Sequence, residues 1–238
     1  MCVLKKIIFF LLFTACCFPR LSAISNEFID ARVATANAAV GNYEWWHSKG
    51  RFSIGRADGT RLLYGFPNAI WSSMTTVKID SPGNTLVIYG AEGSGNYIQN
   101  PVETIDAAGV SVNTSRWEAF GSNVVVQQKL SIVENPRGGG DMDTVAIEYT
   151  LINNNTFTAR AGIRVMLDTQ LGTGVDSDCA PVMAAGQGRI VQEQKWEGED
   201  VPEAWLTVDN TENPQIKAEG YLKGGGAVGP DRLIIGQW

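Results

Sequence analysis

Several stretches of the chain alternate between apolar and polar side chains, which is the pattern of a β-strand with one buried face. The clearest stretch is 124–133, where alternate positions fall on one face: Val124, Val126, Gln128, Leu130 and Ile132. Residues 145–152 and 161–167 repeat the pattern, and a short apolar run at 86–89 precedes several glycines. The periodicity therefore predicts strands at these four places.

Segments rich in Gly, Asn and Pro separate the predicted strands and mark turns. Residues 153–156 are three asparagines and a threonine, and we expect them to close a hairpin between the strands on either side. Residues 136–141 and 224–230 predict two further turns, and a strand-like run follows at 233–235. For residues 26–40 the pattern leaves a short helix and an irregular lead-in both open.

Helical periodicity is almost absent from the chain, and strands do not alternate with helices as they do around a parallel sheet. Many short strands separated by turn residues are typical of antiparallel architectures. We therefore predict an all-β fold. Its expected form is an antiparallel two-sheet β-sandwich of the supersandwich kind, with few or no helices and a single domain.

The first residues follow the order of a secretory signal peptide. Two lysines come first, residues 7–17 form an uncharged and mostly apolar run, and small residues end at Ala23. The run is shorter than the ~20 apolar residues that a membrane-spanning helix needs. We expect a signal peptide at 1–23, cleaved after Ala23, a single domain at 24–238, and no transmembrane span in the mature chain.

The leader also holds three of the four cysteines, which leaves Cys179 alone in the mature part. No intramolecular disulfide can form there, and we expect Cys179 to be buried, because a free cysteine behaves as a small hydrophobe. Residues 13–16 loosely resemble a bacterial lipobox, so a lipid anchor at Cys16 is an alternative to simple cleavage. The expected location is secreted or in the cell envelope, in the periplasm or at the cell surface.

The mature part is acidic. The whole chain has a formal net charge of −6, and the leader contains basic residues but no acidic ones, so the excess of negative charge grows when the leader is removed. An acidic surface repels phosphate groups, which argues against nucleic acids and anionic lipid surfaces as partners.

Some segments resemble a known group of proteins. They are 147–153 (IEYTLIN), 161–169 (AGIRVMLDT), LG at 171–172, 201–205 (VPEAW) and 230–238 (PDRLIIGQW). Across 50–238 the chain resembles a largely uncharacterised group of exported bacterial β-sandwich proteins, with a layout similar to the large sandwiches of galactose-mutarotase-like domains. The resemblance implies a fold and assigns no activity. It also implies that the chain is a C-terminally truncated member, which we state as an expectation.

Aromatic side chains supply the first candidate site. The chain has seven tryptophans: Trp45, Trp46, Trp71, Trp117, Trp196, Trp205 and Trp238. Sugars stack on exposed indole faces, whereas buried indoles fill sandwich cores. Neighbours on a strand point to opposite faces, so one of Trp45 and Trp46 can be exposed while the other is buried. We name Trp45, Trp46, His47 and Trp71 as candidate ligand-binding residues, with core packing or a structural role as the alternative for each.

The sequence gives no reason to assign catalytic residues. His47 is the one histidine, which excludes metal sites built on several histidines, and the G-x-S-x-G nucleophile motif is absent. These observations favour a non-enzymatic role and leave catalysis open.

An acidic group supplies a candidate metal site. Asp168 ends a predicted strand, a glycine-containing turn follows, and Asp176 and Asp178 come next. Carboxylates spaced in this way can converge on a hard cation such as Ca²⁺, which takes about 6–8 oxygen ligands. In the alternative interpretation Asp168 caps the turn and the other two carboxylates are solvated.

Three functions remain open from the sequence. The favoured one is an exported, non-catalytic module that binds a glycan or another cell-surface partner. The second is a carbohydrate-active enzyme, mutarotase- or glycosidase-like, that uses paired carboxylates. Its candidate carboxylates are Glu44, Asp168, Glu193 and Glu203. The third is a structural surface protein without a ligand site.

Overall fold

The computed structural model describes residues 21–35, 49–67, 73–80, 85–91, 93–172, 182–184, 188–224 and 226–236. Regular structure in these ranges consists of β-strands and one short 3-10 turn, η3 (Gly198–Asp200). No helix in the described ranges is long and apolar enough to cross a membrane. The predicted all-β class is confirmed.

The strands of the described ranges form antiparallel sheets. The central sheet contains, in spatial order, β6 (Gly95–Ile105), β7 (Ser111–Ala119), β8 (Val124–Val133) and β9 (Thr144–Asn153). The N-terminal sheet contains β1 (Leu21–Ser25), β2 (Ile29–Ala34) and β3 (Phe52–Arg56). The middle sheet contains β10 (Ala161–Met166), β4 (Met74–Ile79) and β5 (Thr85–Ile88).

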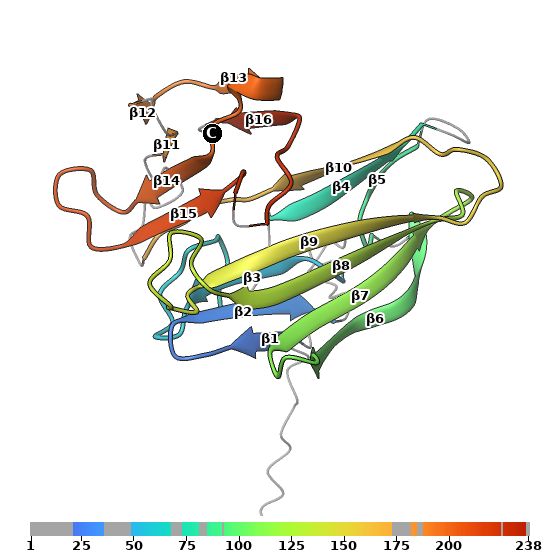
Figure 1. Ribbon diagram of the computed structural model, residues 1–238, viewed down its shortest axis with the longest axis horizontal. Helices are drawn as coiled ribbons and strands as arrows, with labels where there is room; N and C mark the ends of the chain where they lie inside the picture. Colours follow the sequence, from blue (N-terminus) through green and yellow to red (C-terminus); the bar gives the residue numbers. More distant parts are fainter. Residues whose placement is uncertain are drawn as a thin grey trace, which may run out of the picture.

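In the described ranges six further strands follow β10 and lie at one end of the molecule, in orange and red in Figure 1. The C-terminal sheet contains β12 (Arg189–Ile190), β11 (Val182–Ala184), β14 (Ala204–Val208) and β15 (Lys217–Tyr221). The C-terminal ribbon pairs β13 (Gln194–Glu197) with β16 (Arg232–Ile235).

One face of the central sheet carries the core of the protein. Leu130 and Ile132 of β8 pack with Ile24, Val33 and Phe52 of the N-terminal sheet. The other half of the same strand face packs on the middle sheet, where Val124 and Val126 meet Val77 and Ile79. Two smaller sheets thus cover the central sheet in a sandwich-like packing, and the N-terminal one is seen in blue in Figure 1.

Gln128 lies on the same face of β8, between these two apolar clusters, and is 1% exposed. Its Nε2 donates to the Gly50 carbonyl at 2.9 Å and to the Tyr149 hydroxyl at 2.7 Å. The Tyr149 hydroxyl also bonds to the hydroxyl of Thr75 on β4. Gln128 therefore connects the segment before β3 with the middle sheet, and it satisfies buried polar groups that would otherwise be costly.

Three tyrosines pack edge to face in this polar part of the core. The ring of Tyr89 lies 6.0 Å from Tyr97, 6.1 Å from Tyr149 and 5.5 Å from Trp117, measured between ring centroids. The Tyr89 hydroxyl bonds to the hydroxyl of Ser115 at 2.7 Å. Gly50, at φ 78°, has no room for a side chain, because a Cβ would come within 2.5 Å of the Tyr97 hydroxyl.

The predicted strands of period two are confirmed. Residues 124–133 are β8, whose alternate side chains are buried as expected, and the runs at 145–152, 161–167 and 86–89 coincide closely with β9, β10 and β5. The turn expected at 136–141 connects β8 to β9, with three glycines at positive φ.

The predicted hairpin at 153–156 is wrong. β9 pairs with β8, whereas β10 pairs with β4 in a different sheet. The asparagines do form a local turn, since the Asn155 backbone N–H donates to Asn153 Oδ1 at 3.0 Å. However, Asn155 Nδ2 donates to the Ser122 carbonyl, which fastens the segment to the neighbouring β7–β8 turn. The expected turn is therefore present, but the hydrogen bonds within a turn do not determine the strand with which the following segment pairs.

Neither interpretation of 26–40 holds for its described part. Residues 29–34 form β2, with Ile29, Ala31 and Val33 buried at alternate positions. Asn26 shapes the preceding turn, because its Oδ1 accepts the backbone N–H groups of Phe28 and Ile29 at 2.9 Å. The alternation was present in the sequence, but a small alanine at its centre weakened the apolar signal.

β1 begins before the expected cleavage point and continues through it. All five of its residues pair with β2, from Leu21 opposite Ala34 to Ser25 opposite Asp30. Ile24 is 0% exposed. The bond after Ala23 therefore lies inside a paired strand.

Polar side chains connect the turn between β8 and β9 with the C-terminal sheet. Arg137 in this turn pairs with Glu219 on β15. Tyr221 on the same strand donates to Glu219 Oε2 at 2.8 Å and to Asn135 Oδ1 at 3.3 Å. The contact is polar, unlike the apolar packing between the other sheets.

Replacing Ile24 tests whether β1 belongs to the core. Ile24→Ala should lower the free energy of unfolding by about 2–5 kcal/mol, because it removes a fully buried side chain. Ile105→Ala is the matched control, since Ile105 is 67% exposed and its loss should cost less than about 0.5 kcal/mol. Urea unfolding measures both values, and equal losses would contradict the placement of Ile24.

The tyrosine cluster predicts alkaline unfolding. Burial raises the pKa of Tyr149 to about 12 and raises the pKa of Tyr89 and Tyr97 as well. In the unfolded chain these phenols ionise near the usual 10, so the stability they contribute is complete below pH 10 and is lost as the pH rises toward 12. Phenolate absorbance should therefore rise together with loss of the β-sheet circular dichroism signal. Ionisation of every tyrosine near pH 10 with an unchanged spectrum would contradict the burial.

Candidate functional site

The predicted aromatic site cannot be placed. Trp45, Trp46, His47 and Trp71 lie outside the described residues, and their role stays a prediction. The described chain resumes after His47 at Lys49, whose ammonium lies 5.7 Å from the centre of the Tyr97 ring.

Arg51 lies two residues further on and is 2% exposed. Burial lowers its pKa to about 10, so the guanidinium stays charged at neutral pH. The guanidinium lies 4.0 Å from the sulfur of Met74 on β4, and a buried cation is a feature that functional sites share with structural networks.

The predicted calcium site is described at one position only. Asp168 follows β10, where its backbone N–H donates to Ser73 Oγ at 3.1 Å and its carbonyl accepts the Tyr64 N–H at 2.9 Å. Asp176 and Asp178 lie outside the described residues. Within the described ranges no group of three acidic, histidine or cysteine side chains could hold a metal ion. The calcium hypothesis therefore stays a prediction.

The carboxylates considered for glycoside chemistry have different surroundings. Asp168 lies beside Ser73, Glu193 lies against Gly236 after β16, and the Glu203 carbonyl accepts the Leu222 N–H at 2.7 Å. Glu44 is outside the described residues. Nothing in the described part of the chain brings the other three together in one cleft.

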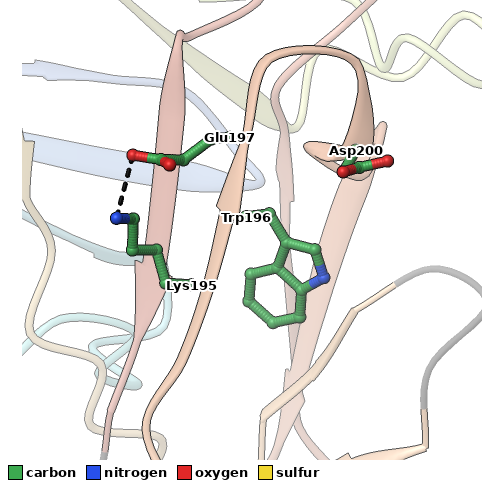
Figure 2. A pocket seen from close by; sticks show the side chains of 4 residues that line it. All are labelled: Lys195, Trp196, Glu197 and Asp200. Carbon is green, nitrogen blue, oxygen red and sulfur yellow. Dashed lines mark ion pairs between the residues drawn. The ribbon is translucent and has the colours of Figure 1, made fainter.

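An open pocket of about 440 Å³ lies on the C-terminal ribbon and is lined by Lys195, Trp196, Glu197 and Asp200. Three of these residues are consecutive on β13, where side chains alternate between the two faces. Figure 2 shows the consequence: Lys195 and Glu197 point to one side of the strand, and the indole of Trp196 points to the other. Trp196 is half-buried, so part of its indole remains accessible.

The turn after β13 brings Asp200 to this pocket. Gly198, at φ 58°, starts η3, and its N–H donates to the Asp231 carbonyl at 2.9 Å. Val201, which is 2% exposed, anchors the other end of the turn. The Lys223 ammonium donates to the carbonyls of Glu199 and Val201. The position of Asp200 is thus fixed by backbone contacts on both sides.

Glu197 is held by two cations. Its Oε1 lies 2.9 Å from the Lys195 ammonium and 2.7 Å from Nη2 of Arg232, the residue opposite it on β16. The hydrogen bond from Lys195, followed by the charges of Lys195 and Arg232, keeps the pKa of Glu197 below its usual value. The side chain is ionised at neutral pH and ordered by its partners.

The pocket combines one aromatic face with several charged groups. Small-molecule sites commonly measure about 300–1,000 Å³ and are lined mostly by apolar side chains, whereas three of the four residues that line this pocket are charged. The sequence analysis includes Trp196 among the seven tryptophans but does not choose it as a candidate ligand-binding residue. The available signal was an aromatic residue between two opposite charges, directly before a Gly-Glu-Asp turn.

Comparison of the chain with protein-family models, with curated proteins and with solved structures finds no match. The resemblance stated from the sequence is therefore untested, and function has to be argued from the pocket itself.

Variants of the two cations test the electrostatics of Glu197. Lys195→Met should raise the pKa of Glu197 toward 4.5, and by more than Arg232→Gln does, because Lys195 makes the larger contribution. The favourable pairing is present above the pKa of the unfolded chain and is lost as the pH falls through the lower folded value. Carbon-detected NMR titration of the carboxyl group measures the shift. Lys129→Met is the control, and an unchanged Glu197 pKa in Lys195→Met would contradict the pairing.

Proposed function

We propose that this protein is an exported, non-catalytic β-sandwich module that binds carbohydrate in the pocket beside Trp196. The observation that carries the proposal is the partly accessible indole of Trp196, which lies on the same side of β13 as the Asp200 carboxylate at an open pocket. A sugar ring would place its apolar C–H face on the indole, and its hydroxyl groups would bond to the Asp200 carboxylate, which lies on the same side of β13 as the indole.

The charges of the pocket favour binding over catalysis. A glycosidase needs a general acid whose pKa is raised toward neutral pH. The two cations instead lower the pKa of Glu197, which makes it a hydrogen-bond acceptor and a poor proton donor. A carbohydrate-active enzyme is therefore the second candidate.

The leader supports the cell exterior as the place of action. A basic start followed by an uncharged apolar run is the pattern of export, and the acidic chain would avoid anionic lipid and nucleic acid. The outer surface of a cell and the periplasm are both rich in glycans, so a sugar-binding pocket has ligands there.

Replacing Trp196 tests the binding site. We expect the wild-type protein to bind at least one oligosaccharide in a panel of neutral, acidic and amino-sugar glycans, measured by tryptophan fluorescence and isothermal titration calorimetry. Trp196→Ala should weaken that binding at least tenfold, which corresponds to about 1.4 kcal/mol, because it removes the stacking face. Lys195→Met should weaken the binding less, because it leaves the indole in place.

Phe157→Ala is the matched control, because Phe157 is an exposed aromatic residue on the β9–β10 connection, away from the pocket. Its binding should equal that of the wild type. Binding that is unchanged in Trp196→Ala, or absent for every glycan, would contradict the proposal. Release of reducing sugar from a bound glycan would favour the enzyme.

A further inference from the structure

β1 is a complete part of the N-terminal sheet. Its residues Leu21, Ser22 and Ala23 pair in register with Ala34, Val33 and Arg32 of β2. Ile24 enters the core cluster that also contains Val33, Phe52 and Leu130. The strand therefore contributes backbone pairing along its whole length and side-chain packing at Ile24.

The first half of β1 also has a buried polar partner. Asn113 on β7 is 1% exposed, and its Nδ2 donates to Ser22 Oγ at 2.9 Å. The other polar atom of this side chain, Oδ1, is buried without a hydrogen bond from the described residues. Loss of Ser22 would therefore leave both polar atoms of a buried amide unsatisfied, which is strongly unfavourable.

Cleavage after Ala23 would cause that loss. It would remove three of the five residues of β1, together with their pairing to β2 and the partner of Asn113. Ile24 would become the first residue of the chain, so a charged terminal amine would lie directly beside the core. Burying a charge without a partner is costly, and free chain ends fray.

We propose that the leader is removed upstream of Leu21, so that the mature protein keeps all of β1. This inference rests on the proposed export. Residues 14–17 are small (Thr, Ala, Cys, Cys) and end the apolar run of residues 7–17, so they satisfy the requirement for small side chains before the cut. The reaction is hydrolysis of one peptide bond by a host leader peptidase. Water supplies the hydroxyl of the new carboxyl group and a proton of the new amine.

The N-terminus of the exported protein tests this directly. The full chain is expressed with its own leader in a bacterium, and the exported fraction is analysed by intact mass and N-terminal sequencing. The expected first residue lies between 16 and 21, with or without a lipid on Cys16. A first residue of Ile24 would overturn the inference while leaving export intact. An uncut chain that stays in the cytosol would contradict export itself.

Two matched variants give an independent answer, because cleavage precedes folding of the exported chain. Ala23→Arg places a long charged side chain before the bond after residue 23, and it should be processed at the wild-type rate. Ala15→Arg makes the same change inside the small segment, before the cut whether the chain then starts at residue 16 or at residue 18, and it should slow processing at least tenfold. The reverse order of effects in a pulse-chase experiment would overturn the inference.

Discussion

The fold depends on one strand face that two sheets must share. The core face of β8 is apolar at both ends and carries Gln128 between them, so the sheets that cover it meet at a polar position. The amide of Gln128 reaches Gly50 on one side and Tyr149 on the other. Both bonds come from Nε2, and Tyr149 bonds in turn to Thr75 of the middle sheet, so these contacts link both covering sheets to the central one, while Oε1 accepts no hydrogen bond from the described residues. Gly50 is required at this point because the tyrosine rings occupy the space of a side chain.

Sequence patterning recovers the strands wherever alternation is strong and local. It placed β8 correctly, including the polar Gln128 on the core face. It failed at 153–156, where the turn was right and the pairing wrong, because strand pairing is set by contacts far apart in the chain. The candidate site is harder to predict from the sequence than the strand pairing. Trp196 resembles any other tryptophan in the sequence. Its pocket requires the pairing of β13 with β16, in which Glu197 lies opposite Arg232, 35 residues later in the chain.

The C-terminal ribbon shows how a weakly buried element can still present an ordered site. Surface ion pairs contribute little stability individually, but Glu197 bonds to two cations that come from both strands of the ribbon. The rigid turn at Gly198 then places a second carboxylate beside the indole. Order here comes from strand pairing and backbone geometry, while the accessible face is supplied by Trp196.

The order of the sheets along the chain also determines when each can fold. β6 to β9 follow one another as neighbours and can assemble from local hairpins, whereas β1 to β5 come first and have no layer to cover until β9 exists. At roughly 5–20 residues per second, the ribosome takes on the order of 5–20 s to make the segment between β3 and the end of β9. During that interval the apolar side chains of the nascent N-terminal strands remain exposed, because the sheet that covers them has not yet been made. The first strands can therefore complete their packing only after the central sheet has been made.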